Sequence, residues 1–308
     1  MLNGIDSTAC GSEAIVPAGQ QEGKTHQIKR IAVYHFITHN GLLVNELFLE
    51  TLRKNNLADF RSLMDFQGGS PVKKTRYRSL VKIRLGDRYF YLKRHLWPSR
   101  ERIRSLMPWS AREDARNEWN NMNLLNALGF HTMVPVAFGE EKRSGMTCSS
   151  LTLTEGIVDS EKLETYLPAH FLPPLSVERM REKRDLIRRL ALLAGEFHRK
   201  GLNHQDFYLG HLLLRPGDGV ISIIDLQRVH RRKRVSMHDR VKDLGQLCYS
   251  AGKTGVLTRT DLMRFIQSYL GRDRITGEDK KLIGRVLSKT AKIARHDAKL
   301  IQRRKAGA

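Results

Sequence analysis

The hydrophobic pattern of the chain changes character near residue 158, and the change predicts two kinds of structure. Before this point, short apolar runs bounded by glycine and charged residues are typical of β-strands. Four such runs predict strands, at residues 74–84, 88–94, 133–138 and 150–155. Gly86-Asp87 lies between the first two and indicates a hairpin turn.

One helix is predicted among these strands. Ser110-Ala111-Arg112-Glu113 has the spacing of a capping box that begins a helix, and Gly129 is placed to end it. Upstream, apolar residues recur at mixed spacing between residues 31 and 64, which predicts a short strand or helix packed on the first lobe.

After residue 163 the periodicity becomes helical. Four apolar side chains fall on one stripe of an amphipathic helix: Leu186, Leu190, Leu193 and Phe197. Three more helices are expected near the C-terminus, at residues 240–250, 261–270 and 278–304. The pattern as a whole predicts an α+β fold with a mobile polar tail (residues 1–28), a small β-rich lobe (29–158) and a helical lobe (159–308).

Charge changes the picture, because 54 Lys and Arg face 32 Asp and Glu, for a net charge of +22 and a pI near 10.2. Such an excess indicates an anionic partner, and nucleic acid, anionic lipid headgroups and phosphorylated sugars all qualify. The three cysteines are too far apart to form a CxxC pair. No apolar run reaches the roughly 18 residues that span a bilayer. We therefore expect a cytoplasmic protein.

The candidate chemistry lies around residues 204–225. His204 and Asp206 follow the glycine that ends the amphipathic helix, and Asp225 follows the apolar run 220–224. A carboxylate at a strand end suits Mg²⁺, which prefers oxygen ligands. A carboxylate on the preceding loop is placed to accept a proton from a hydroxyl. With an upstream lysine, these residues are the parts needed for phosphoryl transfer.

Several segments in this order match one family. They are Phe90-Tyr91-Leu92-Lys93, Asn117-Glu118-Trp119-Asn120, Val136-Ala137-Phe138-Gly139-Glu140, Leu153-Thr154-Glu155, the run Asn203–Leu214, Ile224-Asp225-Leu226-Gln227-Arg228 and Val241-Lys242-Asp243-Leu244. Together they resemble the lipopolysaccharide core heptose kinases of the Kdo/WaaP kinase family, which have a protein-kinase-like fold. The resemblance covers about residues 72–270.

The resemblance implies a role for each matching residue. Lys93 would contact the α- and β-phosphates of ATP and pair with Glu118, and the backbone after Glu155 would meet the adenine. Asp206 would orient or deprotonate the sugar hydroxyl, and Asp225 would hold Mg²⁺. The remaining expected roles are metal-side contact by His211 and structural support by His204 and Asp243.

The chain departs from the general kinase pattern at three points. His211 stands where protein kinases carry a metal-binding asparagine, although the lipopolysaccharide kinases share this histidine. Gln205 replaces the arginine of His-Arg-Asp, and only seventeen residues separate Asp225 from Asp243, which argues against activation by loop phosphorylation. Gly68-Gly69-Ser70 lacks the G-x-G-x-x-G spacing of a phosphate-binding loop.

The basic stretch between Arg228 and Lys242 holds seven Lys or Arg against one Asp. It is either a solvated loop or a contact surface for acidic groups of the acceptor, and the candidate contacts are Arg228, Arg231, Arg232 and Arg234. His211 likewise has two interpretations, a metal-side ligand or a purely structural hydrogen bond.

The resulting hypothesis is a kinase that uses ATP and Mg²⁺ to phosphorylate a sugar hydroxyl, with a heptose of the lipopolysaccharide inner core as the expected acceptor. It would bind the lipopolysaccharide core or lipid A-core peripherally at the anionic inner face of the inner membrane. A kinase acting on Kdo, another small molecule or a protein remains an alternative. A basic nucleic-acid-binding protein is a second alternative, but aromatics make up only 7% of the chain and no aromatic-basic platform is present, so no nucleic acid partner is expected.

Overall fold

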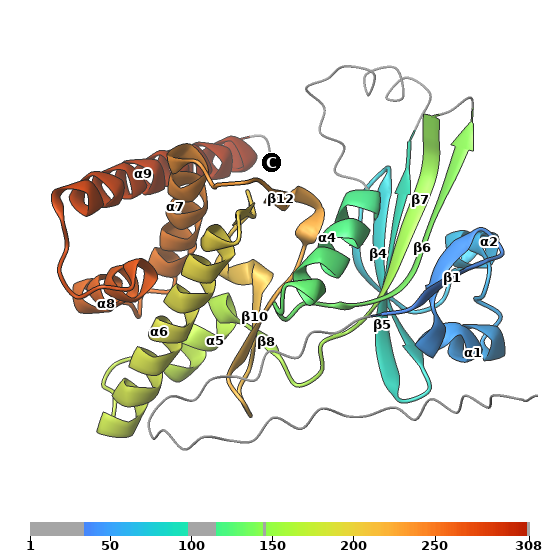
Figure 1. The fold of residues 1–308 in the computed structure, drawn as a ribbon, viewed down its shortest axis with the longest axis horizontal. Helices are drawn as coiled ribbons and strands as arrows, with labels where there is room; N and C mark the ends of the chain where they lie inside the picture. The colour runs from blue at the N-terminus through green and yellow to red at the C-terminus, as the bar shows by residue number, and fades with distance from the viewer. Residues whose placement is uncertain (1–33, 98–114, 144–145, 307–308) are drawn as a thin grey trace, which may run out of the picture. The chain divides into compact units, whose positions relative to one another are not determined.

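An antiparallel sheet of seven strands occupies the first half of the described chain (Figure 1). The computed structural model describes residues 34–97, 115–143 and 146–306, so the predicted tail and capping box lie outside the described residues. In chain order the strands are β1 (Phe36–His39), β2 (Leu42–Asn45), β3 (Ser70–Lys74), β4 (Arg78–Leu85), β5 (Arg88–Leu96), β6 (Val134–Arg143) and β7 (Met146–Glu155). Their order across the sheet is β1-β2-β6-β7-β5-β4-β3.

The four predicted strands are confirmed as β4, β5, β6 and β7, each with somewhat different ends. The turn between β4 and β5 is formed at Gly86, whose φ of +61° suits glycine because it has no Cβ. β5 is paired on both sides, with Lys93 opposite Leu80 of β4 and Thr152 of β7. A central strand holds its side chains rigidly, which suits a residue that must be positioned.

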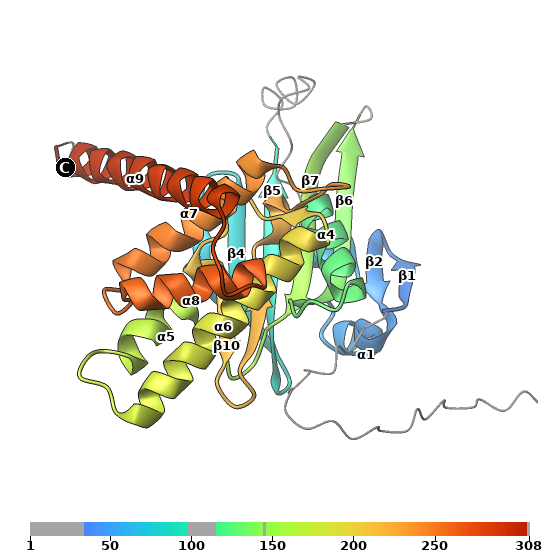
Figure 2. The ribbon, with the colours of Figure 1, turned by 60° about the vertical axis from the view of Figure 1, so that its left-hand side comes forward.

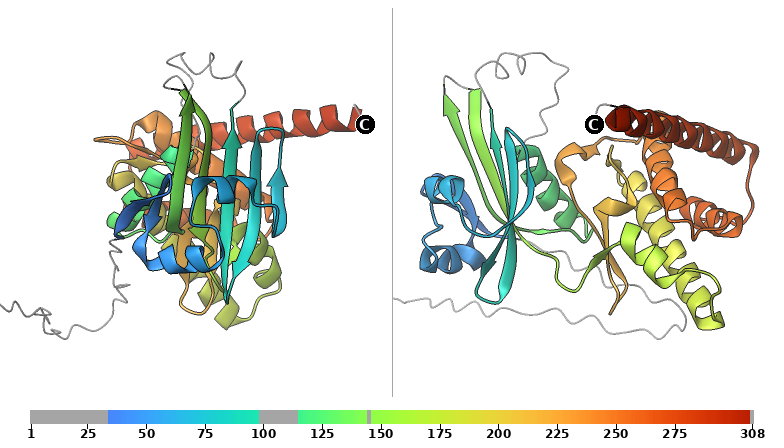
Figure 3. Two further views of the ribbon diagram at one scale, coloured as in Figure 1. Left: turned by 90° about the vertical axis from the view of Figure 1, so that its right-hand side faces the viewer. Right: turned by 180° about the vertical axis from the view of Figure 1, so that it is seen from behind.

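Helices cover both faces of the sheet. The predicted helix before Gly129 is confirmed as α4 (Ala115–Ala127), and it lies between the sheet and the helical part of the chain (Figures 1 and 3). Helices α1 (Glu46–Lys54) and α2 (Phe60–Asp65) lie on the other side of the sheet. The segment 31–64 therefore contains two strands and two helices, more than the single element its spacing predicted.

The second half is mainly helical, as predicted, and its helices are α5 (Leu163–His170), α6 (Val177–Arg199), α7 (Met237–Lys253), α8 (Arg259–Leu270) and α9 (Gly277–Ala306). The apolar stripe of α6 is buried at Leu186, Leu190 and Phe197. Helix α8 packs against α6 and α9 packs against α7 (Figure 2). No helix in the described ranges is long and apolar enough to cross a bilayer.

Short strands and turns between α6 and α7 carry the candidate chemistry. Strands β10 (Leu212–Arg215) and β11 (Val220–Ile223) form a hairpin that pairs with β8 (Glu161–Lys162). Strand β9 (Leu202–Asn203) pairs with β12 (His230–Arg231), and two 3₁₀ turns, η1 (Leu209–His211) and η2 (Leu226–Arg228), follow the two sequence motifs.

Two hydrophobic clusters lie on opposite faces of the sheet. One cluster joins α1 and α2 to the sheet, through residues such as Phe48, Leu63 and Phe90. The other joins α4 to the helical half, from Trp119 to Phe197. The α+β, kinase-like architecture is as predicted, while the division into lobes at residue 158 stays a prediction, because the core beneath α4 is continuous across that point.

Candidate active site

Lys93 and two carboxylates from distant parts of the sequence form the centre of the site. Lys93 Nζ lies 2.9 Å from Glu118 Oε1 on α4 and 3.3 Å from Asp225 Oδ1, just after β11. Asp225 has a φ of +58°, a left-handed conformation that Asp tolerates better than most residues. This backbone geometry directs the carboxylate that follows β11 toward the lysine on β5.

These charges stabilise one another. Burial by itself favours neutral Lys93, but the charges of Glu118 and Asp225 outweigh it and raise the pKa of Lys93. Burial also opposes ionisation of Asp225, and Lys93 and His211 outweigh it, so the pKa of Asp225 is lowered. Lys93 is therefore held in its charged form beside an ionised Asp225 at neutral pH.

Two amide side chains tie the Asp225 turn to α4. Gln227 Nε2 lies 3.4 Å from Glu118 Oε2, and Asn121 Nδ2 donates to the carbonyls of Leu226 and Val229 at 2.8 and 2.9 Å. Sequence reasoning missed both residues. Gln227 lies two residues after Asp225 and Asn121 lies three residues after Glu118, but nothing in the sequence indicates that these two segments contact each other across more than 100 positions.

Asp206 lies on the loop between β9 and η1, where an arginine contacts it. Arg228 Nη1 donates to both carboxylate oxygens, at 2.9 and 3.0 Å. Gln205, immediately before, has a φ of +63°. Of the four arginines predicted to contact an acceptor, Arg228 thus lies beside the proposed base.

Helix α7 fixes the backbone of this loop. Fully buried Asp243 accepts from the backbone N–H groups of His204 and Gln205, at 2.7 and 3.0 Å, and lies 3.3 Å from His198 Nε2. One turn further, Gln246 accepts from the N–H of Phe207 at 3.0 Å, and Ser250 Oγ accepts from that of Leu209 at 3.0 Å. The supporting role of Asp243 stays a prediction, with which these hydrogen bonds agree, whereas Gln246 and Ser250 were missed despite their helical spacing from it.

His204 joins the two motifs. Its Nε2 lies 3.1 Å from the carbonyl oxygen of Ile224, and because a carbonyl only accepts, this nitrogen carries the proton. Burial, reinforced by the neighbouring His211, lowers the pKa of His204 and keeps the ring neutral. Its place in the core fits the predicted supporting role.

His211 faces Asp225. Its Nδ1 lies 2.7 Å from the carbonyl oxygen of Asp206, so Nδ1 donates. Nε2 lies 3.7 Å from Asp225 Oδ2, so a protonated ring forms an ion pair with this carboxylate. A neutral ring presents a lone pair there instead, and two acceptors that face each other suit a shared cation. No group of three or more potential metal ligands occurs among the described residues, so a bound Mg²⁺ would need phosphate or water oxygens as well.

The other predicted site residues are more peripheral. The Glu155 side chain lies 3.3 Å from Arg88, and the adjacent Gly156 N–H donates to the Tyr89 carbonyl at 2.7 Å. Arg231 and Arg234 are exposed, and Arg232 Nε lies 3.6 Å from Asp239. The contacts of these residues with adenine and acceptor stay predictions.

Gly68 and Gly69 do not lie in the connection between β3 and β4, where a phosphate-binding loop would be expected. Gly69 lies immediately before β3, with its φ at +86° and its backbone against that of Lys82. The β3–β4 connection, residues 75–77, contains no glycine. Any phosphate contact at this turn would therefore come from other residue types.

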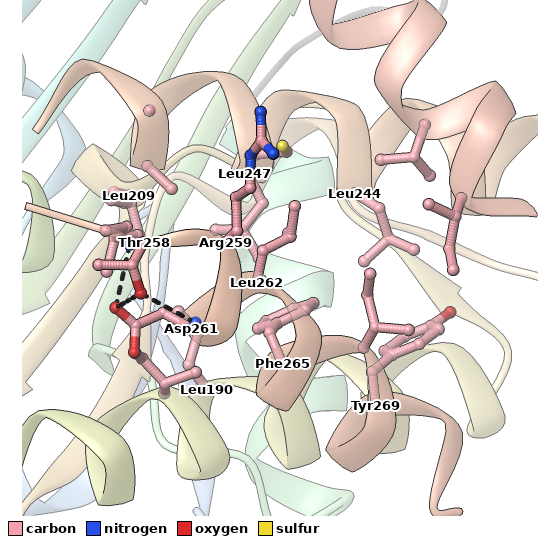
Figure 4. Close-up of a pocket in the computed structure, with 18 of the residues that line it drawn as sticks. Leu190, Leu209, Leu244, Leu247, Thr258, Arg259, Asp261, Leu262, Phe265 and Tyr269 are labelled. Carbon is pink, nitrogen blue, oxygen red and sulfur yellow. Dashed lines mark hydrogen bonds between the residues drawn. The ribbon is translucent and has the colours of Figure 1, made fainter. Parts of the chain in front are cut away.

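A separate apolar cavity of about 280 Å³ lies among α5, α6, α7, α8 and α9. Figure 4 shows the side chains of Leu247, Leu262 and Phe265 among those that line it, with the Thr258–Asp261 hydrogen bonds at one end. None of the charged residues of the Lys93–Asp225 centre lines this cavity.

The fold and the ordered lysine, glutamate and two aspartates define a kinase with a protein-kinase-like architecture. Residues 69–269 match the model of the lipopolysaccharide kinase (Kdo/WaaP) family. The chain belongs to this family.

Similar proteins agree with this membership. The chain is 32% identical, over 237 residues, to the lipopolysaccharide core heptose(I) kinase WaaP of Escherichia coli, covering 73% of this chain and 87% of that one. It is 35% identical over 165 residues to the lipopolysaccharide core heptose(I) kinase WaaP of Pseudomonas aeruginosa, covering 51% of this chain and 60% of that one. A solved structure described as WaaP in complex with acyl carrier protein superposes with a TM-score of 0.65 at 29% identity, covering 82% of this chain and 98% of the other.

Proposed function

We propose that this chain transfers the γ-phosphoryl group of ATP to a hydroxyl of a heptose in the inner core of lipopolysaccharide. The observation that carries the proposal is the convergence of Lys93, Glu118 and Asp225, which His211 links to the Asp206 backbone, in a chain whose relatives are named core heptose kinases. In the reaction, the sugar oxygen bonds to the γ-phosphorus, the bond from that phosphorus to the β-phosphate oxygen breaks, and ADP leaves.

Each residue has one task in this proposal. Lys93, held by Glu118, binds phosphate oxygens of the nucleotide. Asp225 and His211 would hold Mg²⁺, which when bound neutralises phosphate charge. Asp206 orients the acceptor hydroxyl and accepts its proton. Most of the rate enhancement comes from positioning and electrostatic stabilisation, as is general for phosphoryl transfer.

The acceptor also bears on the charge and location of the protein. An inner-core glycolipid carries phosphate and carboxylate groups, and a chain of net charge +22 is attracted to it and to an anionic membrane surface. We propose peripheral binding at the cytoplasmic face of the inner membrane. A vesicle flotation assay with anionic and neutral lipids tests this part independently of activity.

The test of the reaction is direct. The protein is incubated with ATP, Mg²⁺ and dephosphorylated core oligosaccharide, and the product is analysed by mass spectrometry. A gain of one phosphate, mapped to a heptose by fragmentation, is the expected result. Phosphorylation of Kdo or of a protein in place of heptose would redirect the assignment to another acceptor, and no transfer to any acceptor would refute it.

A second proposal concerns a partner. The similar solved structure holds acyl carrier protein, and the cavity in the helical half of this chain is lined almost wholly by apolar side chains. We propose that this chain also binds acyl carrier protein, with the acyl chain in this cavity. The apolar lining supports an acyl chain because burial in such a cavity stabilises hydrocarbon by about 0.8 kcal/mol per CH₂.

A pair of variants on α8 tests this partner. Leu262 lines the cavity, whereas Met263 is 44% exposed and does not line it. Leu262→Glu should abolish capture of long-chain acyl carrier protein, and Met263→Glu should retain it, with circular dichroism confirming that both fold. Equal capture of acylated and unacylated carrier by the wild type would contradict the role of the cavity.

A further inference from the structure

Two cationic side chains converge on one neutral side chain next to the proposed base. Arg228 Nη2 lies 3.4 Å and Lys242 Nζ lies 3.1 Å from Oε1 of Gln205. Arg228 comes from the end of η2 and Lys242 from α7, so the fold brings them together from separate elements. An uncharged amide oxygen compensates neither charge.

The nearby carboxylates leave an excess of positive charge. Asp206 contacts Arg228 and can balance one of the two cations. Asp243, adjacent to Lys242 in sequence, also favours the charged form of Lys242, but Lys289 adds a third cation, so three positive charges face two carboxylates. Burial lowers the pKa of Lys242, and the charge of Arg228 lowers it further, so the two cations repel each other across Gln205.

The amide between the cations is held in place. The N–H of Gln205 donates to Asp243, and its carbonyl accepts from Gln246 Nε2 at 2.7 Å. Both cations are only partly exposed, so part of their hydration has been lost. An anion that approaches these two partly desolvated cations would receive charge-assisted hydrogen bonds, which are stronger than those that the neutral amide oxygen of Gln205 accepts.

We propose that Arg228 and Lys242 bind an anionic substituent of the acceptor, a phosphate monoester or a sugar carboxylate, beside the hydroxyl that Asp206 activates. This inference rests on the proposed function and narrows its substrate class to sugars that are already charged next to the reacting residue. Arg228 keeps its contact with Asp206 in this arrangement and links recognition of the anion to the position of the base.

Binding without ATP tests the proposal separately from catalysis. Isothermal titration calorimetry is performed with dephosphorylated core oligosaccharide, with the same oligosaccharide after reduction of its carboxylates to alcohols, and with inorganic phosphate as a competitor. Weaker binding after carboxyl reduction identifies a carboxylate as the ligand, and competition by phosphate identifies a phosphate site. Equal binding of the charged and reduced forms, without competition by phosphate, would overturn the proposal.

Variants on one helix assign the effect to a residue. Lys242→Met should weaken binding of the charged oligosaccharide on the order of tenfold, the effect of one charge-assisted hydrogen bond, and leave binding of the reduced form unchanged. Lys242→Arg should restore most of the affinity. Lys253→Met, an exposed lysine of the same helix, should have no effect. An equal loss for Lys242→Met and Lys253→Met would show only general charge attraction. If the wild type binds the charged form as expected but transfers no phosphate to any acceptor, the proposed function fails while the anion site stands.

Discussion

Replacing Asp243 by asparagine should separate the bracing of the active-site loop from the chemistry. The substitution keeps the shape of the side chain and exchanges one carboxylate oxygen for an amide NH₂ group. In the wild type, Oδ2 accepts from the His204 N–H at 2.7 Å and faces His198 Nε2, while Oδ1 accepts from the Gln205 N–H at 3.0 Å. The amide oxygen can keep the first pair, and NH₂ then faces the Gln205 N–H, donor against donor.

The expected cost follows from this geometry. One charge-assisted hydrogen bond, which contributes about 1.5–3 kcal/mol, is lost, and the partly buried Gln205 N–H left without an acceptor costs about 1–3 kcal/mol. We expect Asp243→Asn to lower the free energy of unfolding by about 3–5 kcal/mol. This is a large part of the roughly 5–15 kcal/mol typical of a folded protein. The loss should also loosen Gln205 and displace Asp206, lowering kcat on the order of 100-fold.

Urea unfolding followed by circular dichroism measures the stability, and steady-state kinetics measure kcat. The matched control is Asp185→Asn on α6, whose carboxylate is 43% exposed and pairs with arginines at the surface. Exposed ion pairs contribute little, so this variant should change stability by less than about 1 kcal/mol. An Asp243→Asn protein as stable and active as the control would refute the bracing role.

Three further predictions concern other positions in the fold. Asp225→Asn, which suits the φ of +58° better than alanine, should reduce kcat at least on the order of 10³-fold while circular dichroism stays unchanged; near-normal turnover would remove Asp225 from the site. Gly201→Ala should lower the free energy of unfolding, measured in urea, by at least about 2 kcal/mol, because φ is +79° and a Cβ would lie 2.0 Å from the Arg232 carbonyl oxygen. In the control Gly217→Ala, the added Cβ meets nothing within 4 Å, and the free energy of unfolding should change by less than about 0.5 kcal/mol. Burial, aided by the charge of Lys93, lowers the pKa of His95 to about 3. As the pH falls from about 6.5 toward about 3, His95 therefore binds a proton in the unfolded state but not in the folded state. The free energy of unfolding should fall by up to about 1.4 kcal/mol per pH unit across this window. His95→Asn should make the pH dependence of stability shallower across that window, and an unchanged slope would show that His95 is not held neutral.

The elements of the fold follow closely from local patterns in the sequence. Short apolar runs predicted β4 to β7, a 3.6-residue stripe predicted α6, and Gly86 marked the hairpin turn, because these signals depend on neighbours a few positions apart. The stretch before residue 64 was harder, since two very short strands and two short helices leave too few residues for either periodicity to emerge.

The candidate site, too, was predictable from the sequence only in part. The sequence by itself determined which groups are available: Lys93, Glu118, Asp206 and Asp225, each with chemistry that suits its neighbours in the chain. Only the tertiary structure decided that Gln227 reaches Glu118, 109 positions away, and that Arg228 and Lys242 meet at Gln205. Hydrogen bonds and ion pairs act over about 3 Å, and only the packing of α4, α7 and the β10–β11 hairpin sets such distances. A sequence records which side chains exist, but their mutual geometry is a property of the folded core.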